Sequence, residues 1–191
     1  MTVPTRSARE RLVDVASRLF YAEGIHAVGV DRVIVEAGVA KATLYAHFAS
    51  KDELVAAYLA RRSDQWVAAV EQRVASAPTA STEAISKALV PFDVLAERAA
   101  SADYRGCPFI NAAAEFPEPG PVADQITAHR RRIRETFSDL IGEPGCDPGL
   151  LAVIVALYDG AMSAAYLDRE PSVVDHARQG AAELLCGHAD L

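Results

Sequence analysis

The run AGVAKATLYAHF at residues 37–48, followed by ASKDEL at residues 49–54, decides how this chain folds. Leu44 and Phe48 are four positions apart, so they lie on one face of a short helix. A second short helix is expected at residues 30–37, and Gly38 separates the two. Because glycine tolerates backbone conformations that other residues resist, Gly38 favours a sharp turn there. The stretch therefore predicts a helix-turn-helix.

The two faces of this predicted motif differ in chemistry. A small core is expected from the inward residues Val33, Ala37, Val39, Leu44 and Phe48. The outer surface is expected to carry Lys41, Ala42, Thr43, Tyr45 and His47. Their polar groups suit contacts with DNA phosphates and base edges. The alternative is a generic helical hairpin, in which Tyr45 packs half-buried and His47 is merely solvated.

Two further cations extend this candidate DNA-binding surface. Arg32 lies on the first helix of the motif and is a candidate phosphate contact. Lys51 lies at the start of the following helix, where its ammonium and the free N–H groups could hold another phosphate.

The rest of the chain also has helical spacing, which predicts an all-α fold of about nine helices. Ser7 and Glu10 have the spacing of a capping box at the start of the first helix, and Gly24 ends it. Ser50 and Glu53 repeat that spacing before a long helix that Pro78 ends. The remaining helices are expected at residues 82–100, 108–115, 122–141, 148–168 and 172–186.

Composition supports this fold and limits the function. Hydrophobic residues make up 51% of the 191-residue chain, and alanine, the best helix former, dominates them. Residues 1–62 hold nine Lys and Arg against seven Asp and Glu, whereas the remainder holds ten against nineteen. A weakly basic head on an acidic body suits a protein that offers one end to a polyanion.

Cysteine usage and hydropathy indicate a cytoplasmic protein. The three cysteines are odd in number and lack CxxC spacing, which favours a reduced compartment. The start of the chain lacks the apolar run of a signal peptide. Asp159 interrupts the most apolar stretch, residues 150–167, so we expect no membrane association.

The run of residues 24–54 closely resembles the DNA-binding domain of the TetR/AcrR family of regulators. This resemblance covers about residues 6–60 and implies a three-helix domain that places residues 41–47 in the major groove. It implies DNA contacts, mostly to the backbone, by Lys41, Thr43, Tyr45, His47 and Lys51. It also implies a C-terminal ligand-binding and dimerisation domain of roughly six helices. We therefore expect a DNA-binding domain at residues 1–50, linked by helix 51–77, and an effector-binding and dimerisation domain at residues 51–191.

Three positions depart from the family pattern. Gly29 stands where Ser or Thr often caps the second helix, and Ala40 replaces a frequent Ser, which removes a cap and a phosphate donor. Asp31 would repel a nearby phosphate, so its neighbour Arg32 is the expected backbone contact.

The acidic body is expected to hold an unknown, hydrophobic small-molecule effector. Such a site needs apolar walls with a few aimed polar groups. Asn111 is the expected polar group in an apolar pocket, although its segment also fits a plain buried helix. The full set of candidate effector residues is Trp66, Phe92, Phe109, Asn111, Phe116, His129 and Tyr158. The basic run at residues 129–134 fans around its helix and is expected to form ion pairs with the acidic body.

The last two helices are expected to form a homodimer. Helix 148–168 is apolar nearly all round and needs cover on more than one side. A two-fold pair also suits a helix-turn-helix that spans two half-sites. The candidate interface residues are Leu151, Ile154, Val155, Tyr158, Met162, Val174, Ala181 and Leu185. The alternative is that both helices complete the core of a monomer.

These expectations define a transcription regulator, a repressor that an effector releases from a palindromic double-stranded DNA operator. The alternative is an activator or a DNA-binding protein without an effector. No HExxH motif, paired-carboxylate helix or nucleophile with an evident base is present. We therefore expect no enzyme, no cofactor and no metal.

Overall fold

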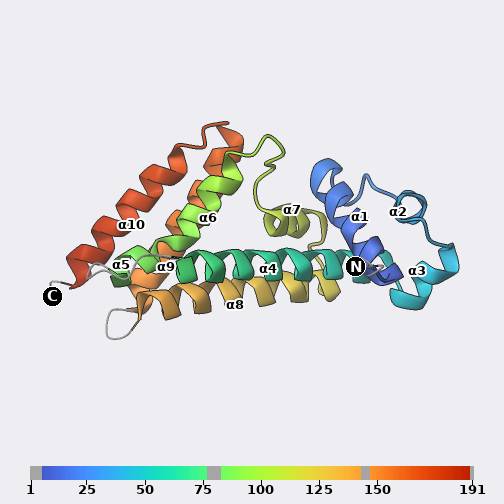
Figure 1. Cartoon of the computed structure of the whole chain (residues 1–191), viewed down its shortest axis with the longest axis horizontal. Helices are drawn as coiled ribbons and strands as arrows, with labels where there is room; N and C mark the ends of the chain where they lie inside the picture. The colour runs from blue at the N-terminus through green and yellow to red at the C-terminus, as the bar shows by residue number, and fades with distance from the viewer. Residues whose placement is uncertain (1–5, 77–82, 143–146, 190–191) are drawn as a thin grey trace, which may run out of the picture. The chain divides into compact units, whose positions relative to one another are not determined.

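The computed structural model describes residues 6–76, 83–142 and 147–189, and these residues form ten α-helices and no strand (Figure 1). The all-α prediction is confirmed. The helices are α1 (Ala8–Glu23), α2 (Val30–Ala37), α3 (Lys41–His47), α4 (Lys51–Ser76), α5 (Glu83–Ala88), α6 (Val90–Ala99), α7 (Pro108–Glu115), α8 (Pro121–Ile141), α9 (Pro148–Leu167) and α10 (Val173–Ala189). The expected helix boundaries at Pro78 and Thr82 lie outside the described residues.

Among the described residues the helix count exceeds the expected nine, because two helices, α5 and α6, replace the single helix expected at residues 82–100. α5 ends at Ala88 and α6 begins at Val90, with Pro91 in its first turn. In a continuous helix the Pro91 ring would clash with the carbonyl of Lys87, four residues earlier. In the first turn of a new helix, the missing N–H of proline needs no partner.

The chain divides into two compact units, which are described separately. Unit 1 comprises Met1–Asp64 and Pro108–Ala128, and unit 2 comprises Gln65–Cys107 and His129–Leu191. α4 and α8 each contribute one part to each unit. This division does not follow the boundary expected at residue 50, because the start of α4 and all of α7 group with the first three helices.

Unit 1 is organised around α1. Ser7 and Glu10 form the expected capping box, in which the Ser7 hydroxyl accepts from the Glu10 N–H at 3.2 Å. Gly24 ends α1 at φ 95°, a conformation that favours glycine. Leu12, Ala16 and Leu19 form a buried stripe on α1, and α1 contacts both α2 and α3.

Unit 2 is built on α6, α9 and α10, which contact one another in pairs (Figure 1). Asp147 caps α9 by accepting from the Leu150 N–H at 2.9 Å, as its place before Pro148 predicts. Phe92, Phe137 and Tyr158 meet edge to face in the core, with ring centroids 5.4–5.9 Å apart. Arg130 pairs with Asp159 at 2.7 Å, in line with the ion pairing expected of the basic run.

α9 is long and apolar enough, by length and composition, to cross a membrane. Its most apolar window has a mean hydropathy of 1.8, and 33% of that window is buried inside the protein. Helices in the cores of soluble proteins meet the same criterion, and α9 packs against α6 and α10. Its composition alone therefore does not make it a membrane span.

Candidate nucleic-acid interface

The turn between α2 and α3 has the geometry that its sequence predicts. Gly38 lies in the left-handed region at φ 63° and ψ 43°. Its N–H and that of Val39 donate to carbonyls of the last turn of α2, with Val39 bonded to Ile34 at 3.3 Å. The chain then leaves α2 sharply and enters α3 at Lys41.

α3 presents one face to the core and the other to solvent. Leu44 is fully buried and Phe48, which follows the helix, is 3% exposed. The side chains of Lys41, Ala42, Tyr45 and His47 are exposed, and Thr43 is half-buried. This is the placement expected of a recognition helix, although the DNA contacts themselves remain a prediction.

Arginine side chains of α1 anchor this motif, and sequence reasoning missed them. The Arg11 side chain donates to the Ala37 carbonyl at the end of α2, at 3.2 Å. The Arg9 guanidinium lies over the Phe48 ring, 5.3 Å from its centroid. The sequence carries no signal for such pairs, because their partners are more than twenty residues away.

Two of the predicted phosphate contacts are paired with carboxylates. The Lys41 ammonium lies 2.9 Å from Asp31, and this hydrogen bond raises the pKa of Lys41. Arg32 donates to Glu23 and to Glu36, each at 2.9 Å, and both bonds raise its pKa. Exposed ion pairs of this kind are weak because solvent screens them, so a phosphate can compete for either cation.

The Lys51 ammonium, a predicted phosphate contact, already has a partner within the chain. Its ammonium donates to the Ile25 carbonyl at 2.7 Å and lies 5.8 Å from the centre of the Phe20 ring. Partial burial lowers its pKa. The ammonium is therefore engaged within unit 1, where it holds the turn that leads from α1 to α2.

The two departures in helix capping are visible in the structure. Gly29 and Ala40 occupy the N-cap positions of α2 and α3 with extended backbones, and neither makes a side-chain cap. Asp31 lies in the first turn of α2, where its charge suits the helix N-terminus.

Four of the seven candidate effector residues come together in unit 2. The Trp66 indole N–H donates to the Tyr158 hydroxyl at 2.9 Å, and the His129 ring meets Trp66 edge to face at 5.7 Å. Phe92 packs against Tyr158. Burial raises the pKa of Tyr158, and burial with Arg130 and Arg132 nearby lowers that of His129 to about 4. Both groups are therefore neutral at pH 7.

The other three candidates belong to unit 1, and the set of seven stays a prediction. Phe109 is buried on the inner face of α7 together with Ala112. Asn111 is exposed rather than enclosed by apolar side chains, because two residues along a helix from Phe109 is the opposite face. Phe116 stacks on His26, with ring centroids 5.1 Å apart.

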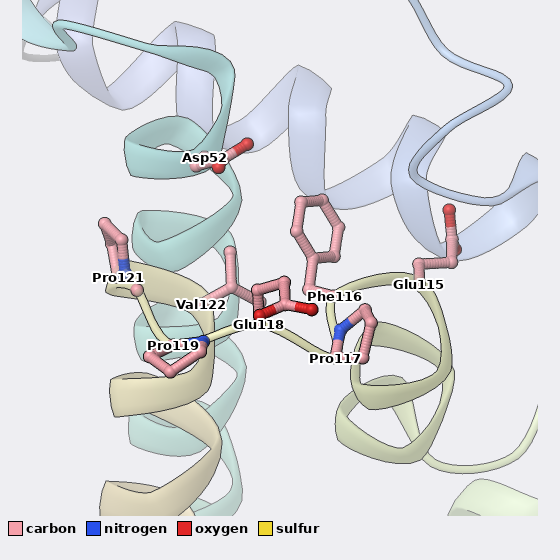
Figure 2. Close-up of a pocket in the computed structure, with 9 residues that line it drawn as sticks. Asp52, Glu115, Phe116, Pro117, Glu118, Pro119, Pro121 and Val122 are labelled. Carbon is pink, nitrogen blue, oxygen red and sulfur yellow. The ribbon is translucent and has the colours of Figure 1, made fainter.

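A cavity of about 170 Å³ lies in unit 1, and Phe116 is the one candidate effector residue in its wall (Figure 2). Asp52, at the start of α4, and the segment 115–122 line it. Its walls combine three prolines and Phe116 with the carboxyl groups of Asp52, Glu115 and Glu118. Pockets for drug-sized ligands are about 300–1,000 Å³, so this cavity is small for an effector.

Most of the residues predicted for the dimer interface lie inside the chain's own core, and the interface itself stays a prediction. All but Leu151 of the eight are buried in the core of the chain itself, namely Ile154, Val155, Tyr158, Met162, Val174, Ala181 and Leu185. Their apolar character does not by itself say which side of each helix faces the core. Among the described residues, the large apolar side chains that α9 and α10 expose are Val153, Tyr166, Leu167 and Leu184.

A helix-turn-helix with an exposed recognition helix, joined to a larger helical unit, defines a DNA-binding transcriptional regulator. Comparisons with known proteins give the family. Residues 12–58 match the model described as "Bacterial regulatory proteins, tetR family", and residues 92–181 match "Tetracyclin repressor-like, C-terminal domain".

Solved structures and curated relatives agree with these matches. SCO4454, a TetR-family transcriptional regulator from Streptomyces coelicolor, is 38% identical with a TM-score of 0.82, over 94% of this chain and 95% of that one. A TetR-type regulator from Streptomyces avermitilis is 25% identical with a TM-score of 0.74, over 92% and 98%. The activator FasR of Mycolicibacterium smegmatis is 43% identical over 70 residues, 37% of this chain and 32% of FasR. The chain thus matches about a third of that relative's length. The chain belongs to the TetR family.

Proposed function

We propose that this chain is a homodimeric regulator that binds a palindromic operator and is released by a small apolar effector. The observation that carries the proposal is the exposed face of α3, where Lys41, Tyr45 and His47 stand above the buried Leu44 and Phe48. A protruding helix of this kind fits the major groove, and a two-fold dimer matches two half-sites. The TetR family is a class of transcription regulators and not of enzymes, so we propose no catalytic step.

The effector part of the proposal rests on the polar groups buried in unit 2. Tyr158 is 2% exposed and His129 is 5% exposed, and both are neutral within an aromatic cluster. Such a cluster suits an apolar ligand with one hydrogen-bonding group rather than an ion. An effector that binds one conformer of unit 2 better than another shifts the population towards it, and operator affinity changes accordingly.

The dimer part of the proposal uses the exposed faces of α9 and α10. On α9, Ala152, Ala156 and Gly160 follow at four-residue spacing and are exposed beside Val153. On α10, Leu184 is 42% exposed. Small residues allow helices of two copies to approach closely, and the apolar side chains supply the buried area. We also propose that the protein is cytoplasmic, because its operator lies there.

The proposed function is tested by DNA binding. The wild-type protein should bind a palindrome from its own upstream region, with an affinity that falls steeply as salt rises. Lys41→Ala should weaken binding to all sequences and flatten the salt slope by about one unit. Lys87→Ala on α5 is the matched control and should leave both unchanged. Absence of salt-dependent binding to any such palindrome contradicts the proposal.

The effector is tested with the same DNA. Trp66 is the only tryptophan of the chain, so its fluorescence reports binding near the Tyr158 hydroxyl. A panel of apolar compounds with one hydroxyl or carbonyl group is titrated, and compounds that shift the emission are added to the protein–operator complex. An effector should release the DNA, and Tyr158→Phe should weaken its binding. A compound that shifts the emission and tightens the complex instead indicates an activator, the class named for FasR.

A further inference from the structure

The turn between α1 and α2 offers two backbone N–H groups to one carboxylate. Gly24 leaves α1 at φ 95°, and the next two amides, those of Ile25 and His26, then lie outside any helix. The Ile25 N–H donates to Oε1 of Glu115 at 3.1 Å, and the His26 N–H donates to Oε2 at 2.6 Å. Successive amides of this kind form a concavity that binds an anion, and Glu115 fills it.

The side chains around this turn strengthen the contact. Nδ1 of His26 lies 2.8 Å from Oε2 of Glu115, and the Phe116 ring stacks on the imidazole with an interplanar angle of 12°. On the other side of the turn, Lys51 donates to the Ile25 carbonyl. The turn is therefore held from two sides. Glu115 accepts from its two N–H groups, and Lys51 at the start of α4 donates to its carbonyl.

Glu115 is far from this turn in the sequence but belongs to the same compact unit. It is the last residue of α7, and Figure 2 shows its side chain extending from the end of that helix beside Phe116. α7 follows directly on Cys107, the last residue of a segment of unit 2. The hydrogen bonds of Glu115 thus tie residues beyond the helix-turn-helix to the turn that sets where α2 begins.

We propose that Glu115 is a positioning residue for DNA binding, whose carboxylate fixes the Ile25–His26 turn and with it the placement of α2 and α3 relative to α1. The inference rests on the proposed operator binding. Hydrogen bonds from N–H groups to a carboxylate are about twice as strong as those between neutral groups. A glutamine of the same shape has one acceptor oxygen and turns its NH₂ group towards one of the two amides, so it cannot satisfy both.

The test compares Glu115→Gln with Glu118→Gln. Both changes remove one negative charge from the same cavity wall, but the N–H groups of Ile25 and His26 donate to Glu115 and not to Glu118. Operator affinity is measured at fixed ionic strength, and thermal unfolding shows whether each variant is folded. Amide hydrogen exchange at Ile25 and His26 is measured without DNA. This measurement separates a local change in the turn from a general loss of stability, which would not single out these two amides.

We expect Glu115→Gln to bind the operator about tenfold more weakly than Glu118→Gln. We also expect its Ile25 and His26 amides to exchange faster, while amides in the middle of α1 keep their protection. Equal or tighter DNA binding by Glu115→Gln, or unchanged exchange at both amides, overturns the inference. The exchange measurement needs no DNA, so it decides the role of Glu115 in the turn even if the wild-type protein binds no operator. A wild-type protein that binds no operator counts against the proposed function itself.

Discussion

Lys41 and Asp31 show how one ion pair tunes a DNA-binding surface. The sequence predicts that Asp31 suits the N-terminus of its helix but repels phosphate, and in the structure its carboxylate also holds the Lys41 ammonium at 2.9 Å. If Lys41 contacts a phosphate as predicted, it exchanges this partner when DNA binds. We therefore expect Asp31 to weaken DNA binding in two ways, by its own charge and by occupying the cation.

Asp31→Asn should raise operator affinity. Removing the carboxylate frees Lys41 and removes a like-charge repulsion, and we expect roughly a threefold to tenfold gain at low salt that shrinks as salt rises. The measurement is fluorescence anisotropy with labelled operator at several salt concentrations. Asp175→Asn on α10 makes the same change in net charge far along the chain. An equal gain in that control would assign the effect to net charge alone.

His129 should make the folded state sensitive to mild acid. Its pKa is lowered to about 4 in the folded chain, first by burial and then by Arg130 and Arg132, whereas an unfolded histidine titrates near 6.5. Between these values the unfolded chain binds the proton more readily. The contribution of neutral His129 to the unfolding free energy is therefore fully present above about pH 6.5. It is lost as the pH falls towards about 4, which lowers the unfolding free energy by at most about 3 kcal/mol.

The check is urea unfolding at about pH 7 and about pH 4.5. His129→Gln should lower the difference in unfolding free energy between the two conditions. His176→Gln, which changes an exposed histidine on α10, should keep the wild-type difference. If both variants keep it, His129 does not carry the acid sensitivity.

At the scale of single elements, α3 is a helix whose first turn lacks a side-chain cap. Ala40 already has the extended backbone of an N-cap residue, at φ −75° and ψ 151°, but it has no oxygen to accept from the helix. Ala40→Ser should therefore stabilise the protein by about 1 kcal/mol without moving the backbone. The midpoint of chemical unfolding should rise. Ala42→Ser, inside the exposed first turn, should give no gain, and an equal rise there would contradict the capping argument.

Local sequence predicts where helices begin and end, but not which side of an apolar helix faces the core. Gly38, Leu44 and the Ser7–Glu10 box are read from neighbours within a few residues, and the structure has them as expected. The side of α9 that a second copy would cover could not be predicted, because the sequence of α9 is apolar nearly all round. Glu115 was missed because its partners lie about ninety residues away, and a carboxylate at a helix end is usually solvated.

At the scale of the whole molecule, we propose that the exposed faces of α9 and α10 pair two copies so that their recognition helices act together. Leu184 is 42% exposed on α10, although it is a large apolar side chain. In a two-fold dimer every interface residue is buried twice, so Leu184→Glu would bring two carboxylates into one apolar interface. Burying charges without partners costs several kcal/mol, which is enough to separate the copies at micromolar concentration.

Leu184→Glu should therefore be monomeric by light scattering and sedimentation, and should bind the palindrome at least about a hundredfold more weakly, because each monomer reads one half-site. Binding to a single half-site should be unchanged, since α3 and its contacts in unit 1 are untouched. Ile110→Glu is the matched control, because Ile110 is 50% exposed but lies on α7. A Leu184→Glu protein that stays dimeric, or a monomer that still binds the full palindrome tightly, would place the interface elsewhere. The loss of palindrome binding with half-site binding intact would tie operator recognition to the pairing of α9 and α10.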